Sequence, residues 1–234
     1  MSKGRTQRFL VVGLFLIGAT LLGKGLYMQA KAHFAQYLIE QAWTKTLADG
    51  QSHKPWSWAD TYPVAKLSIY REQAANSDIE AELNDSLYVL AGASGRNLAF
   101  GPSLVLSSAP AGQKGNTVIA GHRDTHFAIL NGMAVGRRLS LQTLKGNNII
   151  YEVVATQVVN ETETQFMAPS DDNRLTLITC YPFDALQGGA ELRFVVQAIP
   201  VEDESMDTAS ADVSASTGNG MQGKVASVSR SFTH

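Results

Sequence analysis

From Pro63 onward the sequence consists of short apolar runs of β type, each bounded by turn-forming residues. In the first run, Ala65, Leu67 and Ile69 alternate with polar neighbours, which is the two-residue period of a half-buried strand. The predicted strands are residues 65–69, 87–90, 104–106, 117–120, 139–141, 149–154, 158–159, 175–179 and 192–196. Glycine, asparagine and proline lie between most of them. Many short strands at this spacing predict an all-β fold, a sandwich or a barrel, rather than a parallel α/β sheet.

Three segments depart from this β pattern. Apolar residues recur at helical spacing from His33 to Leu47, which predicts an amphipathic stalk that ends near Asp49. The segment that follows, HKPWSWADTYP, has two tryptophans among prolines and is expected to pack in an extended form on the domain surface. A short helix is predicted over Asn76–Leu83, where an asparagine or a serine can cap the first turn.

The N-terminus carries an uncharged run, FLVVGLFLIGATLLG, from Phe9 to Gly23, and the apolar character resumes at Leu26. With Lys24 reaching out to the interface, this segment predicts one transmembrane helix within residues 1–31. Lys3, Arg5 and Arg8 precede it, which predicts a cytoplasmic N-terminus and an extracytoplasmic remainder of the chain. The alternative is a cleaved signal peptide, for which Ala30-Lys31-Ala32 has the form of a processing site.

The C-terminal end, residues 201–234, is rich in serine, alanine, glycine and aspartate. Such a segment buries too little apolar surface to offset its chain entropy, so we expect a disordered tail. The sequence therefore predicts an anchor at 1–31, a helical stalk at 32–51, one folded domain at 52–200 and the tail. A net charge of −2 over 234 residues, with no basic face, argues against a nucleic-acid partner.

The chain has one cysteine, Cys180, so an intramolecular disulfide and a multi-cysteine metal site are both excluded. Cys180 ends the alternating run LTLITC, and Pro182 follows at once. Because proline cannot donate to a sheet ladder, the strand is expected to end here, with the thiol at the rim of the sheet. Cys180 is therefore a candidate nucleophile, and the alternative is a small buried core residue.

A cysteine nucleophile needs a partner that handles protons. His122 follows the β run NTVIAG and also lies at a strand end, whereas His126 is four residues further on. A metal site of these two histidines is disfavoured, because the intervening residues lack the glutamate of a metalloprotease helix. In the last run, Leu192 and Phe194 share one face of the predicted strand, and Arg193 lies on the other face. Arg193 could stabilise an oxyanion if that face lines a groove next to Cys180.

Together, the segments VIAGHRDTHF, TLITCYPF and LRFVV resemble the sortase family, the membrane-anchored cysteine transpeptidases of bacteria. The Tyr-Pro-Phe after the cysteine resembles class D sortases and the sortases of Gram-negative proteobacteria, and PWSWADTYPVAKL and GASGRNLAFGP resemble the latter group. The resemblance covers roughly residues 52–199. It implies an all-β, closed, eight-stranded sortase barrel with short helices, preceded by the transmembrane helix. It also implies a catalytic domain on the periplasmic side of the cytoplasmic (inner) membrane.

The resemblance also implies a chemistry. Cys180 would be the nucleophile, His122 the proton-transfer partner and Arg193 the stabiliser of the oxyanion, with no cofactor and no metal. Such enzymes cut an LPxTG-like C-terminal sorting signal of an exported protein, hold the acyl group as a thioester and pass it to an amine acceptor. Two alternatives remain: a non-catalytic exported β-domain that binds a cell-envelope partner, and a plain cysteine peptidase that releases its product to water.

Overall fold

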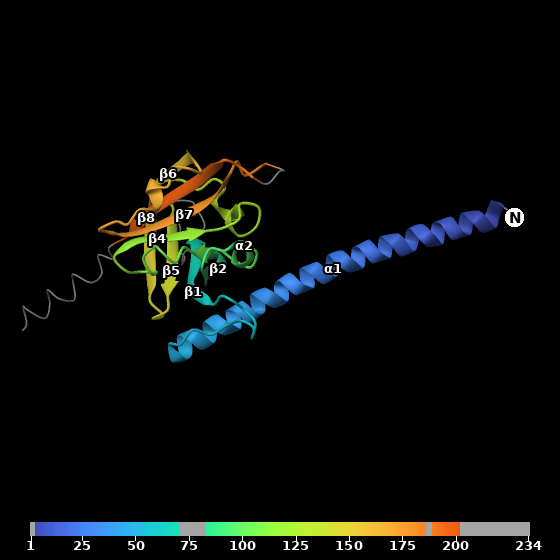
Figure 1. Cartoon of the computed structure of the whole chain (residues 1–234), viewed down its shortest axis with the longest axis horizontal. Helices are drawn as coiled ribbons and strands as arrows, with labels where there is room; N and C mark the ends of the chain where they lie inside the picture. The colour runs from blue at the N-terminus through green and yellow to red at the C-terminus, as the bar shows by residue number, and fades with distance from the viewer. Residues whose placement is uncertain (1–2, 71–82, 186–188, 202–234) are drawn as a thin grey trace, which may run out of the picture. The chain divides into compact units, whose positions relative to one another are not determined.

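Eight β-strands close into a barrel in the computed structural model, which describes residues 3–70, 83–185 and 189–201 (Figure 1). The strands are β1 (Pro63–Tyr70), β2 (Leu83–Ala91), β3 (Ser103–Leu104), β4 (Gly115–Ala120), β5 (Arg138–Thr143), β6 (Asn148–Asn160), β7 (Asn173–Tyr181) and β8 (Leu192–Pro200). Their order around the barrel is β1-β2-β3-β4-β7-β8-β6-β5. The β2–β3 and β4–β7 pairs are parallel, and the other pairs are antiparallel. The predicted closed β-barrel is confirmed.

The helices outside the barrel wall are α1 (Lys3–Asp49), the short α2 (Gly95–Leu98) and two 3₁₀ turns, η1 (His126–Leu130) and η2 (Gln165–Met167). Of the helix predicted over Asn76–Leu83, all but the last residue lies outside the described residues, and Leu83 itself begins β2. The predicted disordered tail also lies outside them, apart from Val201.

The runs predicted at 149–154 and 158–159 form one strand, β6, rather than two. Thr156 and Gln157 interrupt the apolar pattern but continue the ladder, since they pair with Val196 and Val195 of β8. A shift in register between Val153 and Ala155 lets the long strand bend. The apolar pattern predicts only the positions of buried side chains. The backbone hydrogen bonds of β6 continue through the polar residues between the two apolar runs.

The barrel is filled from alternate positions of each strand. Leu175 and Leu177 of β7 point inward and are fully buried, as is Ile119 of the neighbouring β4. Val196 and Ala198 of β8 pair with these two β7 residues and also lie in the core. Because side chains alternate across a strand, the residues between them face the outside of the barrel, and this alternation decides where the functional side chains lie.

Helix α1 is continuous and has two environments along its length. Its N-terminal part exposes large apolar side chains such as Phe15 and Leu22, and the helix is long and apolar enough to span a membrane. Near its C-terminal end Ile39 and Trp43 are buried, and the Trp43 Nε1–H donates to Oε1 of Gln142 on β5 at 3.2 Å. The residues expected to form a stalk therefore include a stretch that packs on the barrel.

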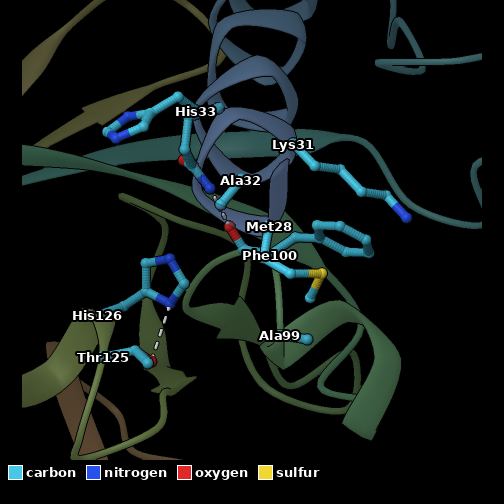
Figure 2. Close-up of a pocket in the computed structure, with 9 residues that line it drawn as sticks. Met28, Lys31, Ala32, His33, Ala99, Phe100, Thr125 and His126 are labelled. Atoms are coloured by element: carbon cyan, nitrogen blue, oxygen red, sulfur yellow. Dashed lines mark hydrogen bonds between the residues drawn. The ribbon is translucent and has the colours of Figure 1, made fainter. Parts of the chain in front are cut away.

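A pocket of about 470 Å³ lies where α1 passes the barrel (Figure 2). Met28, Lys31, Ala32, His33 and Gln36 line it from the helix, and Ala99, Phe100, Thr125 and His126 line it from the barrel. The amide of Gln36 donates to the Phe100 carbonyl oxygen at 2.6 Å, which fastens the helix beside this opening.

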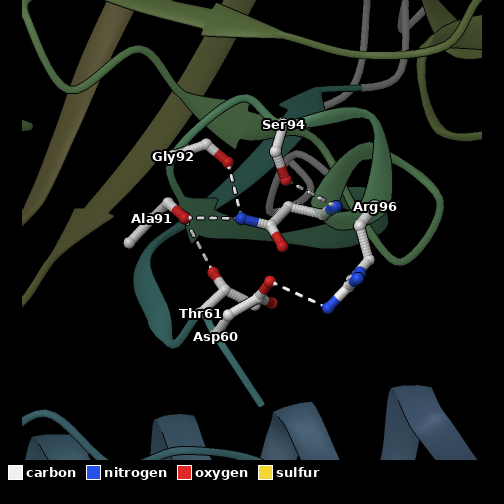
Figure 3. A network of polar contacts seen from close by, with 7 residues as sticks. Asp60, Thr61, Ala91, Gly92, Ser94 and Arg96 are labelled. Carbon is white, nitrogen blue, oxygen red and sulfur yellow. Dashed lines mark hydrogen bonds and ion pairs between the residues drawn. The ribbon is translucent and has the colours of Figure 1, made fainter.

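The tryptophan-containing segment before β1 is tied to the barrel by polar contacts around α2 (Figure 3). The hydroxyl of Thr61 donates to the Ala91 carbonyl at 2.8 Å, and the buried Asn97 amide donates to the same carbonyl at 3.0 Å. An ion pair joins Arg96 to Asp60 at 3.3 Å. Nearby, the ring of Trp56 meets that of Phe100 edge-on at 5.0 Å. These contacts hold the segment against α2 and the end of β2.

Candidate active site

Cys180 and Arg193 lie directly opposite each other on neighbouring antiparallel strands, β7 and β8. Opposite residues of such a pair project from the same face of the sheet. Leu177 and Thr179 are buried on the inner side of β7, so Cys180, at the next position along the strand, faces outward. The thiol and the guanidinium therefore share the outer surface at one end of the barrel, and both side chains are partly exposed.

His122 lies just past the end of β4, the strand that pairs with β7 on the side away from β8. Strand β4 runs parallel to β7 with Ala120 beside Ile178, and His122 follows Ala120 by two residues, as Cys180 follows Ile178. Two hydrogen bonds extend the pairing past the end of β4: the Gly121 N–H donates to the Ile178 carbonyl at 3.1 Å, and the Thr179 hydroxyl donates to the Gly121 carbonyl at 2.8 Å. The three predicted site residues therefore come to the same end of the barrel, on β7 and β8 and just past the end of β4, and these strands are neighbours in the barrel (Figure 1).

The backbone turns sharply after His122, and Gly121 makes this turn possible. The N–H of Phe127 donates to the His122 carbonyl at 2.9 Å, which brings the fully buried Phe127 ring against Gly121. A Cβ at position 121 would lie 2.6 Å from Cγ of that ring. The absence of a side chain at Gly121 therefore lets the Phe127 ring pack into the core directly against the backbone that precedes His122.

We expect Gly121→Ala to destabilise the fold by about 1–3 kcal/mol, the usual cost of overpacking a core, and to reduce activity by displacing His122. The matched control is Gly95→Ala, because a Cβ there meets nothing within 4 Å. Chemical unfolding of both variants measures the difference. Equal stability of the two variants would contradict the packing role assigned to Gly121.

His126 follows on η1 and has a different environment from the exposed His122. Burial lowers the pKa of His126 below its ordinary 6.5, and the charge of nearby His122 lowers it further. A lowered pKa means that protonation favours the unfolded chain. Above about pH 6.5 the neutral His126 costs the fold nothing. As the pH falls below about 6.5 and through the lower pKa of folded His126, the free energy of unfolding decreases.

We expect His122→Gln to raise the pKa of His126, because the variant removes a neighbouring positive charge. The value should stay below 6.5, since burial is the larger cause. Titration of the imidazole signals by NMR measures this shift in wild-type protein and variant. An unchanged His126 titration would show that the two imidazoles do not interact.

Arg123 is a residue that the sequence analysis did not single out. It is nearly buried, at 8% exposure, and its Nη2 donates to the Ala185 carbonyl at 3.1 Å. This contact joins the turn after His122 to the segment that follows Cys180. Its position directly after His122 was visible in the sequence, but its inward orientation depends on tertiary packing.

Three aromatic rings, two from residues that follow Cys180 and one from β8, pack together. Phe183 packs edge-on against Phe194 at 5.5 Å, and Tyr181 stacks on Phe194 at 6.4 Å. Strand β7 ends at Tyr181, immediately before Pro182, as the missing proline N–H led us to expect. Within residues 3–70, 83–185 and 189–201, no group of three histidine, cysteine or acidic side chains could hold a metal ion.

Comparisons with known proteins identify the class to which this barrel belongs. The sortase domain family model matches residues 79–201, just over half of the chain. Sortase D of Bacillus subtilis (strain 168) is 29% identical over 116 residues, which cover 49% of this chain and 58% of that protein. Sortase A of Listeria monocytogenes serovar 1/2a is 26% identical over 183 residues, 73% of this chain and 80% of that protein. The match thus spans little more than half the length of the first relative.

Among solved structures, sortase A from Corynebacterium diphtheriae shares the fold, with a TM-score of 0.51 at 22% identity over 75% of this chain and 87% of that chain. The barrel is therefore a sortase-type barrel. On the family match, the chain belongs to the sortase family, whose members are cysteine transpeptidases. The predicted family, including its resemblance to class D, is confirmed.

Proposed function

We propose that this protein is a membrane-anchored transpeptidase that cleaves a C-terminal sorting signal of an exported protein and transfers the acyl part to an amine acceptor. The observation that carries the proposal is the row of side chains at one end of the barrel. Cys180 faces Arg193 across β7 and β8, and His122 follows β4 on the other side of the cysteine. A nucleophile, an oxyanion donor and a proton-transfer group are the parts that acyl transfer through a thiol requires.

In the first half-reaction the Cys180 thiolate attacks the carbonyl carbon of the scissile peptide bond. Negative charge develops on the carbonyl oxygen, and the guanidinium of Arg193, which pairs with Cys180 across β7 and β8, stabilises it. His122 gives a proton to the leaving amine as the tetrahedral intermediate collapses, and the acyl group stays on Sγ as a thioester. The exposed position of His122 lets it exchange protons with the substrate amine and with solvent.

In the second half-reaction an amine acceptor attacks the thioester. His122 takes a proton from the incoming amine, the oxyanion forms again beside Arg193, and the thiolate leaves. The product carries a new amide bond, and the enzyme returns to its starting state. We propose an LPxTG-like motif as the cleaved signal, because the TLITC and GHRDT segments resemble sortases that cut signals of this type.

The proposed location follows from the N-terminal helix. Its apolar part has the length and hydropathy of a membrane span, and Lys3, Arg5 and Arg8 precede that part. Positive charge before a first span favours a cytoplasmic N-terminus. The barrel, which follows the span, would then lie on the periplasmic side, where exported substrates arrive.

Incubation of the full-length protein in detergent with a pool of LPxTG-like peptides and a soluble amine tests the proposal. We expect an amide between the acyl part of a peptide and the amine, detected by mass spectrometry and absent for Cys180→Ala. Hydrolysed peptide regardless of the amine would instead indicate a cysteine peptidase. No turnover, together with a Cys180 that resists alkylation until the protein unfolds, would indicate a binding domain.

A further inference from the structure

The guanidinium of Arg193 is held by an acidic side chain of the loop that follows β6. Its Nη2 donates to Oε2 of Glu161 at 2.6 Å, and its Nη1 donates to the carbonyl oxygens of Ala190 and Leu192 at 2.5 and 3.0 Å. These contacts use three of the five guanidinium N–H groups within the part of the chain that the structure describes. The remaining two stay available for a substrate oxygen.

Glu161 is placed there by the strand pairing and not only by the length of its side chain. Val159 of β6 pairs directly with Arg193 of β8, and Glu161 lies two residues further along the same chain. The Glu161 N–H donates to the Glu191 carbonyl at 2.7 Å, which continues the ladder one step beyond Asn160. By the two-residue period, Glu161 faces the same side as Arg193 and Cys180.

An oxyanion stabiliser acts most strongly when its donors already point at the reacting oxygen before charge develops. Arginine has a long flexible side chain, so an unsupported guanidinium would have to be ordered during the reaction. At Arg193 a carboxylate and two backbone carbonyls limit this freedom, and the side chain of Arg193 is only 28% exposed.

We propose that Glu161 is a positioning residue, which fixes the orientation of the Arg193 guanidinium on the barrel face that it shares with Cys180, for acyl transfer. The inference rests on the proposed function. A carboxylate that competed with the substrate for the arginine would instead slow the reaction. The sign of the change in rate when Glu161 is removed separates the two effects.

Glu163 provides a matched control on the same loop. Its Oε1 accepts a hydrogen bond from the Asn160 N–H at 2.9 Å, and its Oε2 accepts one from the Gln165 amide at 3.3 Å. It has the same charge and lies two residues away, but its carboxylate serves the turn rather than the arginine. Removal of Glu163 therefore tests for an effect of loop charge or loop folding alone.

The test compares Glu161→Ala, Glu161→Gln and Glu163→Ala in the peptide-transfer reaction of the full-length protein. We expect Glu161→Ala to lower kcat about tenfold, as a small misplacement of a catalytic group does, and to change KM less than about twofold. Glu161→Gln should fall between this variant and wild type, because a neutral amide keeps a weaker hydrogen bond. Glu163→Ala should match wild type, and thermal unfolding should give similar midpoints for all variants.

The decisive arm repeats Glu161→Ala in an Arg193→Gln background under single-turnover conditions. If Glu161 acts through Arg193, its removal has no further effect there, since effects of residues in one network do not add. An active wild type with unchanged or faster Glu161→Ala would overturn the positioning role alone. An equal loss in Glu163→Ala, or a further loss in the Arg193→Gln background, would overturn it too. A wild type that transfers no peptide overturns the proposed function as well as this role.

Discussion

Replacement of Cys180 by alanine is expected to lower the rate of peptide cleavage by at least about 10⁴-fold, because the thiolate forms the covalent intermediate and no other group replaces it. The chain has no second cysteine that could substitute. Peptide turnover by wild type and variant, followed by mass spectrometry, measures the loss.

The fold should survive this substitution. Cys180 is partly exposed at the end of β7, so the loss of its sulfur leaves little or no cavity, and the midpoint of thermal unfolding should barely change. A Cys180→Ala protein that still turns over substrate would rule out the proposed mechanism. A variant that is inactive because it unfolds would leave the chemical role to be tested with Cys180→Ser.

Substitution of Arg193 by lysine is expected to lower kcat about 10²- to 10³-fold, the usual effect of losing an oxyanion donor. Both residues carry a positive charge, so the comparison isolates geometry. The planar fork of arginine bonds Glu161 and two backbone carbonyls at once, whereas a lysine ammonium cannot reproduce that arrangement. Steady-state kinetics of the transfer reaction measures the change.

The KM of the Arg193→Lys variant serves as the control for this prediction. If Arg193 acts on the developing oxyanion, KM changes much less than kcat, because the contact strengthens only in the transition state. A lysine variant with kcat within threefold of wild type would show that charge alone is sufficient. A variant that raises KM while leaving kcat unchanged would assign Arg193 to substrate binding.

The barrel could be predicted from sequence because its strands alternate. Ala65, Leu67 and Ile69 mark β1, and the run that ends in Cys180 marks β7, since the burial of every second residue is a local property of a strand. The merged strand β6 was missed, because Thr156 and Gln157 pair through their backbones without an apolar pattern to reveal it.

The candidate site was predicted in part. Strand ends and an alternating face were enough to propose Cys180, His122 and Arg193. Their alignment depends on which strands are neighbours, and pairing between β4 and β7 joins segments more than fifty residues apart. The contacts of Glu161 and of Arg123 were not predictable for the same reason. Each contact joins two segments that are far apart in the sequence and that only the folded chain brings together.

The central claim is that Cys180 carries the acyl group, and intact-mass analysis of the full-length protein tests it most directly. The protein is incubated with an LPxTG-like peptide without amine, quenched in acid and weighed. We predict an added mass equal to the acyl part of the peptide, absent in Cys180→Ala and removed by hydroxylamine, as a thioester requires. Cleavage of the peptide with no adduct on wild type, or an adduct that persists in Cys180→Ala, would contradict the account.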